Sequence, residues 1–114
     1  MSNNVVVGGA CRTLIGGQAK FVSPIRTYIL PSGKTGFKLC AYIYDQVAHK
    51  CNHRDYIFKV VIYDSMIHKF PIQEGKFYLI YDFFCSDVNT NRQGQSSYDC
   101  ILNEDSFVKE LFSS

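Results

Sequence analysis

Y-I-F-K-V-V-I-Y-D, residues 56 to 64, is the longest clean alternation in this sequence. A strand has a side-chain period of two, so one face of this stretch carries Phe58, Val60 and Ile62. This face is predicted to be core. The other face carries Lys59 and Tyr63, and the pairing of a cation with an aromatic ring suits a phosphate and a base.

The run F-K-L-C-A-Y-I-Y-D, residues 37 to 45, repeats this arrangement. Its apolar face carries Leu39, Ala41 and Ile43. Its other face carries Lys38, Tyr42 and Tyr44. Two such strands side by side would present one mixed surface of lysine and tyrosine. The plainer interpretation is that these are outward tyrosines that pack across strands and solvated lysines, because cross-strand aromatic pairs stabilise any sheet.

Length and composition indicate one β-rich domain. At 114 residues, with 46% hydrophobic and 15% aromatic residues, the chain is long enough for a single core without metal or disulfides. A net charge of +2 means that nucleic-acid binding must be argued from where Lys and Arg lie. Five scattered cysteines without C-x-x-C spacing favour reduced thiols. The start resembles no signal peptide, and no apolar run has the length of a membrane span, so we expect an intracellular protein.

The order of segments predicts an all-β fold, a five-stranded oligonucleotide-binding (OB) barrel with a short C-terminal helix. Residues 1–18 are an N-terminal extension or an extra strand, and residues 19–114 form the domain. The expected strands are 19–30 (interrupted at Pro24), 37–45, 56–64, 76–84 and 97–102, with a helix starting at Asp105 or Ser106. A small β-sandwich has the same strand count, but its outer strand faces usually carry Thr, Ser, Glu and Lys.

Two longer motifs resemble known families. The run Y-I-F-K-V-V-I-Y-D-S-M-I-H-K-F-P-I-Q-E-G-K-F-Y-L-I-Y (56–81) resembles the second OB fold of the protection-of-telomeres proteins, in its I/V-Y-D-x-x-x-H turn and its x-x-x-G-x-F-x-x-I-Y segment. P-I-R-T-Y followed by S-G-K-T-G-F-K-L is similar to the first strand and loop of the DNA-binding folds of replication protein A. The resemblance covers residues 24 to 84 and implies single-stranded DNA lying across one barrel face.

The resemblance also implies residue roles. Tyr63 falls at a base-stacking position and Lys59 at a backbone-contacting one. Two loops, residues 32–35 and 87–95, would close over the strand, and the amides of the second loop, including Gln95, suit hydrogen bonds to guanine. The predicted nucleic-acid-binding residues are Arg26, Tyr28, Lys34, Lys38, Tyr42, Tyr44, Lys59, Tyr63, Asn89, Asn91, Arg92 and Gln93.

No pattern of catalytic residues can be specified, so we expect a protein that is not an enzyme and has no cofactor. His49-x-Cys51-x-His53 lacks a fourth ligand at suitable spacing, which argues against a metal site. The predicted function is binding of a telomeric G-rich overhang or its 3′ end by a monomer at chromosome ends in the nucleus, with other telomere-complex proteins as further partners. Alternatives are general single-stranded-DNA binding of the replication protein A type, or a protein-interaction module.

Overall fold

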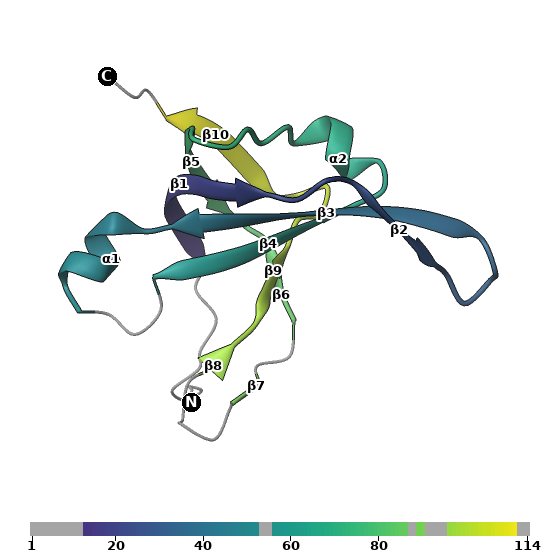
Figure 1. Ribbon diagram of the computed structural model, residues 1–114, viewed down its shortest axis with the longest axis horizontal. Coiled ribbons are helices and arrows are strands. Elements are labelled where there is room, and N and C mark those ends of the chain that lie inside the picture. Colours follow the sequence, from purple (N-terminus) through teal and green to yellow (C-terminus); the bar gives the residue numbers. More distant parts are fainter. Residues whose placement is uncertain (1–12, 53–55, 87–88, 91–95, 112–114) are drawn as a thin grey trace.

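The computed structural model describes residues 13–52, 56–86, 89–90 and 96–111, and most of this part of the chain is β (Figure 1). The all-β class is therefore confirmed. The elements are β1 (Leu14–Val22), β2 (Arg26–Ile29), β3 (Thr35–Tyr44), α1 (Gln46–Lys50), β4 (Ile57–Tyr63), α2 (Met66–Lys69), β5 (Phe77–Tyr81), β6 (Phe84–Cys85), β7 (Asn89–Thr90), β8 (Ser96–Ser97), β9 (Asp99–Ile101) and β10 (Phe107–Leu111). No described helix is long and apolar enough to cross a membrane.

One sheet organises the molecule and curls into a half-barrel. Its strand order is β10-β5-β1-β3-β4-β9-β6, with β2 paired to β3 outside this path and β7 paired to β8 separately. Strands β4 and β9 are parallel, so residues 40 positions apart in sequence become neighbours. The hairpin of β2 and β3 extends beyond the rest of the sheet, as Figure 1 shows.

The inner face of the sheet is the hydrophobic core. Phe58, Val60 and Ile62 of β4 are buried, as their alternation predicts, and so are Ala41 and Ile43 of β3. Because side chains alternate along a strand, the residues between them lie on the outer face. The predicted core face of both strands is therefore confirmed, but Val61, on the other face of β4, is also buried.

Strand β1 allows the sheet to curl. Its first half pairs with β5 and its second half with β3, and Gln18 belongs to both pairings. A Cβ atom at Gly17 would lie 2.0 Å from the carbonyl oxygen of Tyr44, so the two backbones approach this closely only because position 17 is glycine. The register then shifts between Ala19 and Phe21, a bulge that adds bending.

The predicted C-terminal helix is wrong. Residues Phe107–Leu111 form β10, which pairs antiparallel with β5. The spacing of Phe107 and Leu111 fits one helical turn but equally fits two strand repeats, and the exposed edge of β5 provides backbone partners. Val108 then packs against the core, and Phe107 stacks on Tyr81 with ring centroids 4.6 Å apart.

Other differences concern strand number and loops. The described residues form ten strands, several of them only two residues long, rather than five. Strand β1 crosses the predicted boundary between residues 18 and 19. The polar segment after β3 contains α1, because the carboxylate of Asp45 accepts a hydrogen bond from the Ala48 amide.

The prediction of reduced cysteines is wrong for Cys85, which is disulfide-bonded, whereas Cys40 and Cys51 have free thiols.

Candidate nucleic-acid interface

The outer faces of β3 and β4 bring the predicted lysines and tyrosines together. In the antiparallel register Lys38 lies opposite Tyr63, and Tyr42 lies opposite Lys59. All four side chains are half-buried. The arrangement places a cation directly across from an aromatic ring twice, so a backbone phosphate and a base could be held at neighbouring points.

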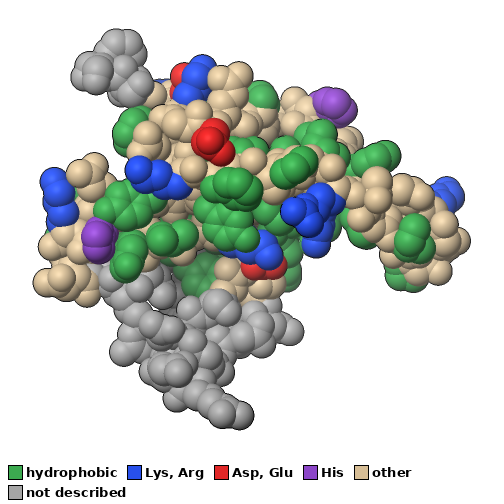
Figure 2. Space-filling view, in the orientation of Figure 1, with side chains coloured by type: hydrophobic (Ala, Val, Ile, Leu, Met, Phe, Trp, Pro, Cys, Tyr) green, Lys and Arg blue, Asp and Glu red, His purple; other side chains and the backbone are tan. Residues whose placement is uncertain are grey.

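The surface continues onto the strands on both sides. On β1, Phe21 pairs with Tyr42, and their ring centroids are 6.0 Å apart. On β9, Asp99 pairs with Lys59, and its carboxylate lies 3.9 Å from the lysine ammonium. Phe21, Tyr42, Lys59 and Asp99 thus form one row across four strands, here called the central row. Figure 2 shows Lys and Arg side chains among hydrophobic ones on one face of the molecule.

The β2–β3 hairpin is attached to the end of β4 through Asp64. The hydroxyl of Tyr28 donates to one carboxylate oxygen at 2.9 Å, and the Phe37 amide donates to the other at 2.8 Å. The Tyr28 ring meets Tyr63 edge to face with centroids 5.5 Å apart. Arg26 lies opposite Lys38 on the same hairpin. These contacts hold Tyr28 beside Tyr63, whereas Lys38 lies between Arg26 and Tyr63 in the sheet.

Gly36 determines where the Tyr28 ring lies. A Cβ atom at position 36 would stand 2.4 Å from the ring carbon that carries the hydroxyl. Partial burial is the main cause that raises the pKa of Tyr28, followed by its hydrogen bond to Asp64 and the charge of that carboxylate. The hydroxyl is therefore a donor throughout the neutral range, as the contact with Asp64 requires.

At the other end of β3, a cluster of rings surrounds Tyr44. The Tyr44 hydroxyl shares a hydrogen bond with His49, and His49 stacks on Tyr56 with centroids 4.4 Å apart. The ammonium of Lys20 lies 5.5 Å from the centre of the Tyr44 ring. Tyr44 is thus on the predicted face but is already packed against other side chains.

This cluster also explains the packing of His49, the first residue of the His49-x-Cys51-x-His53 pattern that resembles a metal motif. Cys51 is exposed after α1, and His53 lies outside the described residues. Within the described ranges, no group of three or more His, Cys, Asp or Glu side chains is arranged to hold a metal ion.

The structure does not test every predicted residue. Lys34 is exposed in the turn of the β2–β3 hairpin. Asn91, Arg92, Gln93 and Gln95 lie outside the described residues, and of Asn89 only the backbone is described, in β7.

Two residues of the central row were not predicted. The alternation from the buried Ala19 would place Phe21 in the core as well, but the bulge between them turns Phe21 outward, where it is 51% exposed. Asp99 alternates with the buried Cys100, which does indicate an outward side chain. The sequence could not show that Lys59 is its neighbour, because the two strands pair in parallel across the sheet.

A hollow of about 410 Å³ occupies a different part of the surface, between β1, β5 and the start of α1. Its apolar lining includes Leu14, Val47, Phe77 and Leu79. Of these, Leu14 and Val47 are largely exposed. This hollow lacks the alternation of cations and rings found on β3 and β4.

The likeness to telomere-protection and replication protein A folds remains a prediction, because it depends on the sequence motifs in residues 24–84. No protein-family model matches this chain, and no curated protein sequence matches it.

Proposed function

We propose that this protein is an OB-fold domain that binds single-stranded DNA across the outer faces of β3 and β4. The observation that carries the proposal is the reciprocal pairing of Lys38 with Tyr63 and of Tyr42 with Lys59. Rings separated by cations match the alternation of bases and phosphates along an unpaired strand. The curled sheet and the projecting β2–β3 hairpin support an OB-type architecture.

The binding energy would come from stacking and from phosphate contacts together. Bases that stack on Tyr42, Tyr63 and Phe21 would each contribute about 1–3 kcal/mol. Arg26, Lys38 and Lys59 would lie near phosphates and make the affinity depend on salt. The role is binding without catalysis.

The proposed target is a telomeric G-rich overhang or its 3′ end, bound at chromosome ends in the nucleus. This choice depends on the resemblance of residues 56–81 to the second OB fold of the protection-of-telomeres proteins. General single-stranded-DNA binding of the replication protein A type would use the same surface but would not discriminate between sequences.

A protein-interaction module is the second candidate, because the apolar hollow beside Leu14 and Val47 offers a surface of a different kind. A partner subunit held there would need no cations. The two functions predict different responses to salt, since only phosphate contacts release counterions from DNA.

Fluorescence anisotropy with labelled G-strand, C-strand and scrambled oligonucleotides at low salt tests the proposal. We expect the G-strand to bind most tightly and all affinities to fall as salt is raised. Equal binding to every sequence would favour a general single-strand binder. No binding at low salt, where phosphate contacts are strongest, would overturn the DNA proposal and leave the protein-interaction function.

A further inference from the structure

Asp99 is an unusual residue for a surface that binds DNA. It lies in the central row, next to Lys59 and two strands from Tyr42. A carboxylate repels phosphate, so on a DNA-binding surface the oxygen positions that Lys59 leaves accessible would face a group of the ligand that donates hydrogen bonds. The bases, rather than the backbone, provide such groups.

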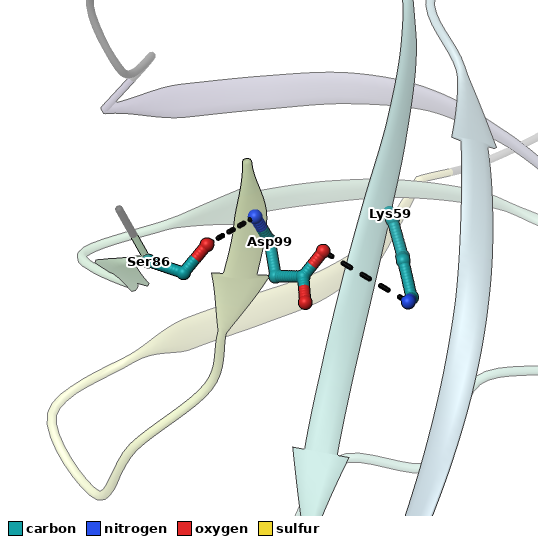
Figure 3. A network of polar contacts seen from close by, with 3 residues as sticks. All are labelled: Lys59, Ser86 and Asp99. Carbon is teal, nitrogen blue, oxygen red and sulfur yellow. Dashed lines mark hydrogen bonds and ion pairs between the residues drawn. The ribbon is translucent and has the colours of Figure 1, made fainter. Parts of the chain in front are cut away.

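The backbone of Asp99 is fixed by its neighbours. Its amide donates to the Ser86 hydroxyl at 2.7 Å, its carbonyl accepts from the Ser86 amide at 2.9 Å, and β9 pairs with β4 on its other side. Figure 3 shows the carboxylate pointing toward Lys59, away from Ser86. The carboxylate therefore projects onto the outer face from a fixed position, as a group that reads bases requires.

The ion pair with Lys59 leaves the carboxylate accessible. The closest distance between charged atoms is 3.9 Å, and the two side chains are 38% and 40% exposed. A carboxylate has about four acceptor positions, so a loose contact with one ammonium group leaves others for a ligand. Lys59 offsets part of the negative charge of Asp99 and remains close enough to the same row to meet a phosphate.

The chemistry of the bases then selects among possible ligands. In a single strand the Watson–Crick edge is available for hydrogen bonding. Guanine has two adjacent N–H donors on that edge, N1–H and the 2-amino group, and these match the two oxygens of a carboxylate. Adenine, cytosine and thymine each place an acceptor beside their donor, which would oppose one carboxylate oxygen. A base stacked on Tyr42, about 10 Å from the β9 backbone, would direct its edge toward Asp99.

We infer that Asp99 reads guanine through its Watson–Crick edge, with Tyr42 as the stacking platform and Lys59 and Ser86 as positioning residues. The inference depends on the proposed DNA-binding function. It assigns base preference to β9, at one end of the central row.

Oligonucleotide analogues test this contact directly in the full chain. Inosine lacks the 2-amino group of guanine, whereas 7-deazaguanine keeps the Watson–Crick edge and changes only the opposite edge. We expect the wild-type protein to bind a guanine oligonucleotide about tenfold more tightly than its inosine counterpart, within the range that one bidentate contact provides. The 7-deazaguanine oligonucleotide should bind as guanine does.

The variant Asp99→Asn removes the charge and one acceptor oxygen while preserving size. Its guanine-to-inosine ratio should fall to less than about twofold, and its affinity for a guanine-free oligonucleotide should be unchanged or higher, because a negative charge near phosphate is lost. Glu104→Gln is the matched control, since it removes one negative charge from an exposed residue outside the central row and should leave the ratio at about tenfold.

The outcomes separate this inference from the proposed function. If the wild-type protein binds DNA but does not distinguish guanine from inosine, or if Asp99→Asn keeps the tenfold ratio, Asp99 is an ordinary surface ion-pair residue and the inference is overturned. If the wild-type protein binds no oligonucleotide at all, the proposed function fails and the inference fails with it. A thermal melt monitored by circular dichroism checks that both variants remain folded.

Discussion

The outer surface of β3 and β4 differs from that of β5 and β10, although both belong to one curled sheet. Both surfaces carry aromatic rings. On β3 and β4, Tyr42 and Tyr63 each face a lysine across the strands, whereas on β5 and β10 Tyr81 and Phe107 stack on each other with an interplanar angle of 23°. A ring that stacks against another has one face less to offer a base. The pairing of rings with cations, rather than the number of rings, therefore distinguishes the surface that we propose binds nucleic acid.

Removal of one tyrosine from each surface should give the largest contrast. Tyr63→Ala should weaken binding of the G-strand oligonucleotide at least tenfold, since it removes a ring worth about 1–3 kcal/mol of stacking. Tyr81→Ala on β5 is the control and should leave the affinity unchanged. Fluorescence anisotropy measures both, and equal losses for the two variants would remove the distinction between the surfaces.

Substitution of a strand glycine by alanine should weaken DNA binding only when the glycine lies beside the outer surface of β3 and β4. Gly36→Ala places a methyl group where the Tyr28 ring now lies, so the ring must move away from Tyr63. We expect affinity to fall about threefold to tenfold, because the surface beside Tyr63 loses its fixed geometry. Gly16→Ala on β1 is the matched control, since its nearest side-chain neighbour, Leu79, would be 3.6 Å away. If the Gly16 variant binds as weakly, the Tyr28 ring has no special role.

Neutralisation of lysines should change the salt dependence by a smaller but distinct amount. Lys38→Ala should reduce the slope of log affinity against log salt by about 1, because one phosphate contact is lost. Lys109→Ala, on β10, should leave the slope unchanged. The comparison requires titrations at several salt concentrations, and identical slopes for the wild-type protein and Lys38→Ala would show that Lys38 meets no phosphate.

The contact between Tyr28 and Asp64 should give the smallest effect, visible only at alkaline pH. The pKa of Tyr28 is raised above its ordinary value of 10.0, mainly by partial burial. Below pH 10 the hydroxyl is protonated in both the folded and unfolded chain, so its contribution to stability is fully present. As pH rises through the folded-state pKa, the hydroxyl ionises beside the carboxylate and that contribution is lost.

Chemical denaturation of the wild-type protein and Tyr28→Phe at pH 8 and pH 10.5 measures this loss. The difference in unfolding free energy between the two proteins should be smaller at the higher pH. A difference that stays constant would mean that the Tyr28 hydroxyl does not interact with Asp64 in solution.

The alternation of side chains predicted well which residues of β3 and β4 form the candidate surface. Side chains repeat with a period of two along a strand, and this period decides which of them face outward. It failed where the backbone departs from that period or where two periods coincide. The bulge before Phe21 reverses the expected face, and the spacing of Phe107 and Leu111 fits both a helix and a strand.

Contacts between segments that are far apart in the sequence could not be predicted either. The tripeptide I-Y-D ends both β3 and β4, yet Asp45 caps a helix and Asp64 holds the β2–β3 hairpin. Local sequence is the same in both places, and only the packing of distant segments distinguishes them. The contact between Lys59 and Asp99 was equally unpredictable from local sequence. The two residues are 40 positions apart and become neighbours only because β4 and β9 pair.

Backbone amide chemical-shift mapping during titration with a G-strand oligonucleotide tests the central claim most directly, because it reports which part of the sheet meets DNA. The largest shifts should fall on residues 38–44 and 59–63, on Asp99 and on the β2–β3 hairpin. Largest shifts at Leu14, Leu79 and Phe107 instead, with β3 and β4 unaffected, would contradict the assignment of the DNA-binding surface.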